Sequence, residues 1–251
     1  MRSLLLAMLM SPAAWAAGDF TFDGADTTCD RVQVTNAALR ITGAITVAAA
    51  WWGTNADGGR IAARSFSDND DNYNLRYNVT GTANWRSSSG AVGAAGYLVT
   101  SSSTTASDGA RHSYTVVYDA ADARGYCDGV LEATDSTVAT PDNPVFAFAI
   151  GASGNGAGGF GSGDAELNID WAIVHNVALA AGEVTQLGHP NSFRRPFRNR
   201  VGYWCMMGKP GTAFGGAGTV SDWSPTKANA DGDDGSTDPT YLPGLTRGAG
   251  R

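Results

Sequence analysis

The chain has few charged residues and few cysteines, and both shortages limit what it can do. Charged residues make up 16% of its 251 positions, and acidic residues exceed basic ones, for a formal net charge of −7. Because nucleic-acid binding needs a basic face that neutralises phosphates, we expect no nucleic-acid partner. The three cysteines, Cys29, Cys127 and Cys205, are far apart and form no CxxC pair. We therefore expect no structural zinc and at most one disulfide.

Long apolar runs are also missing. No stretch approaches the roughly 20 consecutive apolar residues that cross a bilayer, so we expect no membrane span. The N-terminus nevertheless imitates a secretory signal, with Arg2, an apolar run at 4–10 and small residues at Ala14 and Ala16. We expect residues 1–19 to be retained as an N-terminal arm, and cleavage after Ala16 is the alternative.

What the sequence has is a period of two and many glycines. Large apolar and polar side chains alternate over Tyr73–Thr80, which is typical of a strand with one buried face. Turn clusters such as Asn55–Gly59 separate segments of this kind. Further strands are predicted at residues 44–52, 60–65, 97–101, 111–119, 145–150 and 167–175, and one helix at 180–187. Short strands joined by glycine-rich turns predict an all-β, antiparallel β-sandwich.

The character of the sequence changes after Leu187. Gly188-His189-Pro190 interrupts the pattern, and residues 208–251 are rich in glycine, aspartate and proline with almost no periodicity. Such a segment buries little apolar area by itself, so we expect it to lie along a partner or along the sandwich. The predicted organisation is an arm at 1–19, a sandwich at 20–188 and an irregular C-terminal extension at 189–251.

Several motifs follow one another in a characteristic order. Residues 111–119 end in Tyr-Asp, and residues 124–133 contain Asp128-Gly129, a tight-turn signal between two alternating strands. Phe148–Gly151, a glycine-rich loop, Leu167–Leu179 and a short helix come next, and Phe20–Asp26 precedes them all. In this order they resemble laminin-G-like and pentraxin-like domains over about residues 20–188. The resemblance implies a concanavalin A-like jelly roll, but a fold alone assigns no function.

The resemblance extends to glucanases, which carry their catalytic carboxylates on one strand. Retaining glycoside hydrolysis needs two carboxyl groups about 5 Å apart. The nearest counterpart here is Glu166, Asn168 and Asp170 on one face of a predicted strand, and Asn168 is no carboxylate. The histidines fit no metal-ligand spacing and no nucleophile motif: His112, His175 and His189. We therefore expect no catalytic residue and no enzymatic activity.

A dense run of oxygen donors precedes the strand at Tyr73. Hard cations prefer carboxylate and carbonyl oxygens, and the resemblance to pentraxins implies a calcium role for an Asp-Asn pair. The loop at residues 151–163, which should supply further carboxylates, contains no acidic residue. A solvated turn is therefore the alternative, and no other cofactor is expected. The candidate calcium ligands are Asp68, Asp70, Asp71 and Asn72.

Aromatic side chains offer candidate glycan contacts, because sugar rings pack against aromatic faces. The candidates are Trp51, Trp52, Trp85 and Tyr97. Trp51 and Trp52 are adjacent in a predicted strand, so they point to opposite faces and at least one can be exposed. A role as core aromatics is the alternative.

A basic stretch stands out in the otherwise acidic chain. It contains Arg194, Arg195, Arg198 and Arg200. We expect these side chains to contact an acidic neighbour, and a solvated linker is the alternative.

These features favour a non-enzymatic structural protein of a tailed-bacteriophage virion that carries a lectin-like sandwich. Residues 200–204, Asp222-Trp223-Ser224 and Asp238-Pro239 resemble the extension that follows such domains in phage proteins. The expected role is decoration of the capsid or tail, or attachment to host-surface glycans. The expected partners are other virion proteins, cell-surface glycans and further copies of the chain. A secreted bacterial lectin-like carbohydrate-binding protein is the alternative, and a glycoside hydrolase is a third.

Overall fold

The structure is a computed structural model of the full chain. It describes residues 20–21, 31–34, 36–53, 59–65, 71–77, 82–87, 98–105, 108–136, 141, 147–151, 168–188, 199–205, 219–220, 230–233 and 240–241. The N-terminal arm predicted at residues 1–19 lies outside these residues. No helix in the described part of the chain is long and apolar enough to span a bilayer.

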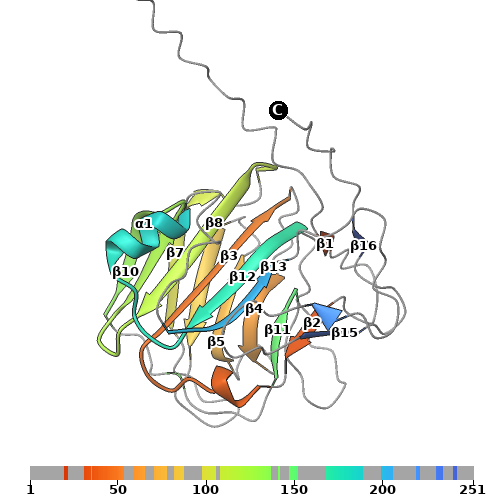
Figure 1. Ribbon diagram of the computed structural model, residues 1–251. Coiled ribbons are helices and arrows are strands. Elements are labelled where there is room, and N and C mark those ends of the chain that lie inside the picture. Colours follow the sequence, from red (N-terminus) through yellow and green to blue (C-terminus); the bar gives the residue numbers. More distant parts are fainter. Residues whose placement is uncertain are drawn as a thin grey trace, which may run out of the picture.

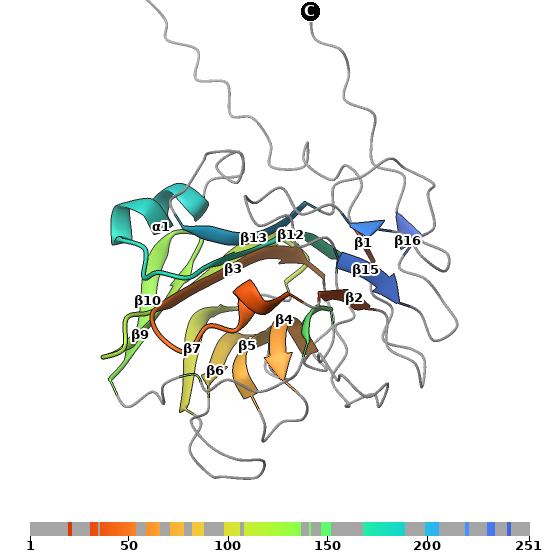
Figure 2. The ribbon, with the colours of Figure 1, turned by 60° about the horizontal axis from the view of Figure 1, so that its bottom comes forward.

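Two antiparallel sheets pack face to face, and Figures 1 and 2 show them as separate layers. The first, sheet A, runs in the order β10-β9-β8-β3-β12-β1-β16, and β13 also pairs with β12. Its strands are β1 (Phe20–Thr21), β3 (Ile45–Trp52), β8 (Arg111–Tyr118), β9 (Ala123–Cys127), β10 (Val130–Asp135), β12 (Asn168–His175), β13 (Arg200–Cys205) and β16 (Thr240–Tyr241). The predicted antiparallel sandwich is therefore confirmed.

The second layer, sheet B, runs in the order β14-β15-β2-β11-β4-β5-β6-β7. Its strands are β2 (Arg31–Val34), β4 (Gly59–Ser65), β5 (Asp71–Tyr77), β6 (Thr82–Ser87), β7 (Leu98–Thr105), β11 (Phe148–Ile150), β14 (Thr219–Val220) and β15 (Ala230–Asp233). The alternating segment predicted from Tyr73 is β5, which begins two residues earlier than expected. A short 3₁₀ helix, η2 (Ala37–Leu39), is capped by the Asn36 side chain, which accepts a hydrogen bond from the Ala38 amide.

The main core lies between the two sheets. It combines inward side chains of sheet A, such as Val47 and Trp51, with those of sheet B, such as Leu75 and Trp85. Burial of these side chains provides most of the driving force for closing the sandwich.

The helix α1 (Ala181–Gly188) packs on the outer face of sheet A, as Figure 2 shows. Val184 and Leu187, three residues apart on one side of the helix, form a buried cluster with outward side chains of the sheet such as Val117 of β8. The helix was predicted at residues 180–187 and is confirmed within one residue.

The hairpin predicted at Asp128-Gly129 joins β9 to β10. Both residues have positive φ, 49° at Asp128 and 80° at Gly129, as a two-residue turn matched to the twist of its strands requires. The end of α1 contacts this turn, because a Cβ added at Gly188 would lie 2.5 Å from the Asp128 carbonyl carbon and the Gly129 nitrogen. This turn therefore fixes where α1 ends on the sheet.

The segment after residue 188 contributes to both sheets. β13 pairs with β12, β15 pairs with β2, and β16 pairs with β1. The domain boundary that we placed at residue 188 stays a prediction. The extension was expected to lie along a partner or along the sandwich, and these three strands pair with strands of the sandwich.

Candidate functional site

A row of three side chains crosses neighbouring strands of sheet A near their ends. Arg111 at the start of β8 is paired with Trp52 at the end of β3, and Trp52 is paired in turn with Asn168 at the start of β12. Directly opposed residues of antiparallel strands project from the same face. Ala50, two residues before Trp52, belongs to the outer face, so this row does too. We call Arg111, Trp52 and Asn168 the outer row, and all three are partly exposed.

A β-bulge places a carboxylate next to the outer row. The register between β12 and β3 shifts between Ile169 and Trp171, which makes Asp170 the extra residue. Bulges re-aim side chains in this way and are common beside functional sites. Asp170 is almost fully buried and accepts a hydrogen bond from Nε of Arg111.

The ion pair holds the guanidinium in place at the start of β8. The Arg111 side chain remains 23% exposed, whereas that of Asp170 is 2% exposed. The Oδ1 atom of Asp170 is buried and has no hydrogen-bond partner among the described residues. Buried acceptors without a partner are uncommon in folded proteins, although Asp170 shares this property with several other buried side chains of the described structure.

The aromatic residues predicted as glycan contacts differ in their burial. Trp51 and Trp85 are fully buried in the main core, so neither ring has a face open to a ligand, and their prediction as glycan contacts is corrected. Trp85 stacks on Tyr73 with ring centroids 6.0 Å apart. Trp52 keeps an exposed part, as the alternation of faces predicted, while Tyr97 lies outside the described residues.

The predicted calcium ligands stay predictions. Asp68 and Asp70 lie outside the described residues, and the backbones of Asp71 and Asn72 form the start of β5. The side chains of this pair lie outside the described part of the chain.

Of the four arginines predicted to contact an acidic neighbour, the structure describes only Arg200. Arg194, Arg195 and Arg198 lie outside the described residues. Arg200 begins β13, and its guanidinium carbon lies 4.7 Å from the centre of the Tyr203 ring, in a cation–π contact within the chain.

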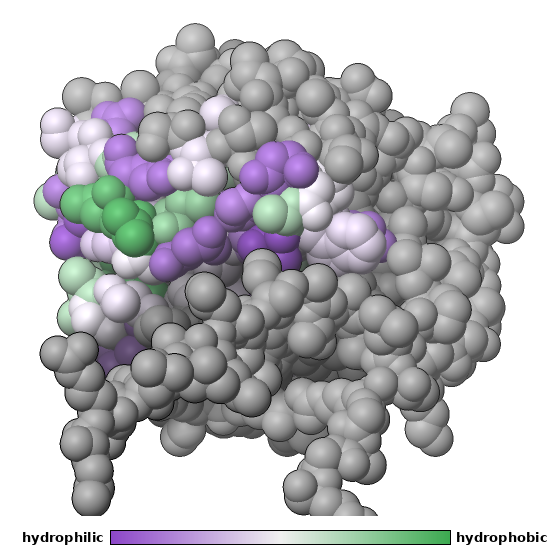
Figure 3. All heavy atoms as spheres, turned by 90° about the horizontal axis from the view of Figure 1, so that it is seen from above, coloured by the Kyte–Doolittle hydropathy of each residue, from purple (hydrophilic) through white to green (hydrophobic). Residues whose placement is uncertain are grey.

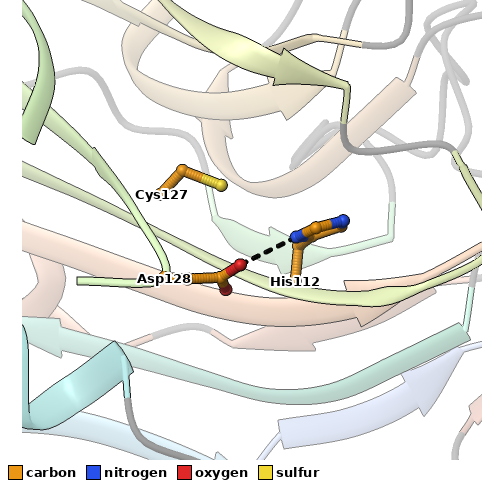
Figure 4. A group of neighbouring side chains, drawn as sticks. All are labelled: His112, Cys127 and Asp128. Atoms are coloured by element: carbon orange, nitrogen blue, oxygen red, sulfur yellow. Dashed lines mark hydrogen bonds and ion pairs between the residues drawn. The ribbon is translucent and has the colours of Figure 1, made fainter. Parts of the chain in front are cut away.

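A second polar group lies on the inner side of β8, next to the tight turn (Figure 4). His112 is paired with Trp51 and so projects toward the inner face. Its Nδ1 lies 2.9 Å from Oδ2 of Asp128, and the Ser113 amide donates to Oδ1 of the same carboxylate at 2.8 Å. These contacts fasten the β9–β10 turn to β8.

The charges in this group are mutually stabilised. The hydrogen bond to Asp128, with another to Cys127, raises the pKa of His112 to about 10. Burial acts to raise the pKa of Asp128, but hydrogen bonds from His112 and the Ser113 amide hold it below its usual value. This chemistry at His112 was not predicted from the sequence, because Cys127 and Asp128 are fifteen and sixteen residues away along the chain.

Figure 3 shows one strongly hydrophobic patch on a largely hydrophilic described surface. The large hydrophobic side chains exposed among the described residues are Val130 and Leu131, at the start of the edge strand β10. Neither belongs to the outer row, so they provide independent positions for control substitutions.

A protein-family profile of the laminin-G type, described as concanavalin A-like lectin/glucanases superfamily, matches residues 26–185. The chain belongs to this superfamily. The family resemblance seen in the sequence is thereby confirmed, and the concanavalin A-like sandwich has the fold that the family implies. Among curated proteins, no sequence matches this member of the superfamily.

Solved structures place this concanavalin A-like domain beside pentraxins and carbohydrate-binding proteins. A heptameric SAP-like pentraxin from Limulus polyphemus matches with a TM-score of 0.58 at 15% identity, over 92% of this chain and 98% of the pentraxin. A candidate carbohydrate-binding protein from Bacteroides ovatus matches with a TM-score of 0.64 at 12% identity, over 90% of this chain and 61% of that protein. The CBM40 of the Ruminococcus gnavus IT-sialidase matches with a TM-score of 0.50 at 11% identity, over 69% and 97%. These likenesses show the fold.

Proposed function

We propose that this domain is a non-catalytic, lectin-like module that binds a carbohydrate at the outer row. The observation that carries the proposal is the position of Trp52, whose partly exposed side chain lies between Arg111 and Asn168 on one face. The candidate carbohydrate-binding protein from Bacteroides ovatus shares the fold and supports the same class of function.

The three side chains suit a sugar because they combine an apolar face with hydrogen-bonding groups. The Trp52 indole offers a flat surface for the C–H face of a pyranose ring. The Arg111 guanidinium donates hydrogen bonds, and the Asn168 amide both donates and accepts them, which matches the hydroxyls around the ring. Because Asp170 fixes Arg111 in advance, little side-chain entropy is lost on binding.

The absence of hydrolysis is part of the proposal. Asp170 bonds to Arg111 rather than to a second carboxyl group, and the residue two places before it is Asn168. Retaining hydrolysis requires a second carboxylate about 5 Å away. We expect no new reducing ends from a panel of polysaccharides, and hydrolysis that Asp170→Asn abolishes would overturn this part.

The binding site can be tested with a glycan array, followed by calorimetry on the best ligand with and without Ca²⁺. Trp52→Ala should weaken binding about tenfold to a hundredfold, or about 1.4–2.8 kcal/mol, because the stacking face is lost. Trp52→Phe should retain most of the affinity because it keeps an aromatic face.

Leu131→Ala is the matched control, since Leu131 is 51% exposed and lies outside the outer row. Its affinity should equal that of the unmodified protein, with far-ultraviolet circular dichroism confirming the fold of each variant. An unchanged affinity in Trp52→Ala would place the ligand elsewhere. An array without any ligand would leave decoration as the role of the domain.

We further propose that the domain is displayed on a tailed-bacteriophage virion, where it associates with copies of itself and with capsid or tail proteins. The low-periodicity extension and the lack of a catalytic motif in the sequence support this setting. The protein from its native source should co-sediment with particles at its full-length mass. A soluble species that lacks about the first 16 residues would instead support a secreted lectin-like protein.

A further inference from the structure

Three side chains that bind transition metals converge where β8 meets the β9–β10 turn (Figure 4). They are the imidazole of His112, the thiol of Cys127 and the carboxylate of Asp128, and their potential ligand atoms all lie within 4.8 Å of one another. Cys127 is a buried free thiol, whereas the Asp128 side chain is 48% exposed. The cluster therefore has one buried member and one that reaches solvent.

The backbone holds this arrangement without help from the side chains. Tyr114 is paired with Cys127, so the start of β8 lies beside the end of β9. The Asp128 amide donates to the Ser113 carbonyl at 2.8 Å, which extends the ladder by one bond past the strand end. The three side chains thus come from a paired segment whose geometry is fixed by the sheet, as a preorganised site requires.

A second carboxylate orients the imidazole from its far side. Nε2 of His112 lies 3.2 Å from Oδ1 of Asp108, while Nδ1 lies 2.9 Å from Oδ2 of Asp128. Metal-binding histidines commonly donate one ring N–H to a carboxylate, which leaves the other nitrogen unprotonated for the metal. With Asp108 accepting from Nε2, Nδ1 points at the carboxylate of Asp128. Either a proton or a metal ion must then lie between that nitrogen and Asp128.

The turn can be held to β8 without the sulfur atom of Cys127. The bonds from His112 and Ser113 to Asp128 hold the turn, and Cys127 belongs to the main hydrophobic core together with Tyr114, its partner on β8. A valine at residue 127 would fill such a position equally well. The thiol adds a third, soft ligand at the point where a nitrogen and a carboxylate oxygen already meet.

We propose that His112 Nδ1, Cys127 Sγ and one carboxylate oxygen of Asp128 form a binding site for a zinc-class divalent metal ion. Thiolate and imidazole select such ions over calcium and magnesium, which take oxygen ligands. Bond lengths of about 2.0–2.3 Å place neighbouring ligands of a tetrahedral Zn²⁺ roughly 3.3–3.8 Å apart. Atoms within 4.8 Å of one another reach these separations by small side-chain rotations.

The exposed side of the site leaves a fourth position for water. Three protein ligands with one open position are the pattern of zinc sites that exchange ligands, whereas purely structural sites are closed by four. The outer row lies on the outer face of sheet A, whereas His112 projects toward the inner face. The proposed metal site and the proposed carbohydrate site can therefore be tested independently of each other.

Cobalt provides a direct test, because Co²⁺ replaces Zn²⁺ and a cobalt–thiolate bond absorbs in the near ultraviolet. The reduced full-length protein should bind one equivalent of Co²⁺ with this band, and added Zn²⁺ should remove the band. Cys127→Ser should abolish it, and His112→Gln should weaken binding at least tenfold. Cys29→Ser and Cys205→Ser are the matched controls, and each should retain the band.

Folding of the variants is checked independently by circular dichroism, and Cys127→Val provides a second variant that suits the apolar surroundings of residue 127. Zn²⁺ should raise the Tm of the unmodified protein and leave that of Cys127→Val unchanged, since a ligand that binds only the folded state stabilises it. The proposal is overturned if the full-length protein shows no thiolate band, or if the band persists in a folded Cys127→Ser or Cys127→Val protein.

Discussion

Asp119 closes the turn between β8 and β9 with one carboxylate. Its Oδ1 accepts hydrogen bonds from the amides of Ala121 and Asp122, at 3.0 and 3.1 Å, and its Oδ2 accepts from Arg124. The backbone hydrogen bond from Asp122 is the largest influence, and together these contacts hold the pKa of Asp119 below its usual value. The ionised form therefore stabilises the turn.

Asp119→Ala should lower the free energy of unfolding at pH 7 by about 1 kcal/mol, a value reduced by the partial exposure of the carboxylate. A lowered folded-state pKa gives stability that is present above the unfolded value and lost as the pH falls through the folded one. The difference between the two proteins should thus shrink below about pH 3.8. Urea titrations at pH 7, 4 and 3 measure it, and a constant difference would contradict the electrostatic cause.

For single residues, the sequence predicted which side chains project from the same face of a strand, but it did not predict which of the two faces is buried. The period of two correctly placed Trp51 and Trp52 on opposite faces of β3. It could not tell which face was the inner one, because both sides of this strand carry alanines and tryptophans. That choice depends on the partner sheet, whose position follows from contacts between residues far apart in the sequence.

The strand β13 shows how an element can be hidden from sequence analysis. Val201, Tyr203 and Trp204 are all buried, so the strand lacks the alternation that marked β5. Trp204 stacks on Phe148 of sheet B with ring centroids 5.1 Å apart, and it also lies over Gly202 in its own strand. The ring leaves no room for a side chain at residue 202.

Gly202→Ala should destabilise the protein by about 1–3 kcal/mol, because the new methyl group overlaps the Trp204 ring and displaces it from the core. Thermal unfolding followed by tryptophan fluorescence reports both the loss of stability and the movement of the ring. Gly43→Ala is the control, since nothing lies within 4 Å of the added Cβ, and it should change the Tm little. Equal effects of the two substitutions would mean that the contact with Trp204 is unimportant.

The cluster of His112, Cys127 and Asp128 could have been predicted from the register of the β8–β9 hairpin, counted outward from its turn. The turn at Asp119–Asp122 fixes the register, which brings Tyr114 opposite Cys127 and leaves His112 next to Asp128. Both strands and the Asp-Gly turn were predicted correctly, but the spacing of ligands was compared only along the chain and not across the hairpin. By contrast, the bulge at Asp170 has no local sequence signal, so its ion pair with Arg111 could not have been predicted.

For the whole molecule, the longer strands of the sandwich could be predicted from the sequence, whereas the short strands at the ends of the two sheets could not. Most strands between residues 45 and 175 were predicted from alternation and turn residues, but β6 was not, and neither was the order of the strands in the two sheets. The pairing of β14, β15 and β16 was not predicted either, because strands of two to four residues carry too little pattern to recognise. These strands are placed by the edges of the sheets that receive them.

A chain truncated after Gly188 should therefore fail to form a cooperatively folded sandwich, although it retains the whole segment that resembles the family. It lacks β13, and with it the fully buried Trp204. We expect broad thermal unfolding and binding of a hydrophobic dye, as in a compact state without fixed packing. A sharp transition close to that of the full-length protein would show that the extension is dispensable.

The side of β12 that faces away from β3 pairs with strands from distant parts of the chain, with β1 at Asn168 and Ile169 and with β13 from Trp171 to His175. On the ribosome, the nascent chain presents β1 and β12 well before residues 200–205 emerge. During that interval, most of this side of β12 is open and can pair with other chains. We therefore expect the yield of folded protein to depend on the elongation rate and the chaperone supply over this stretch.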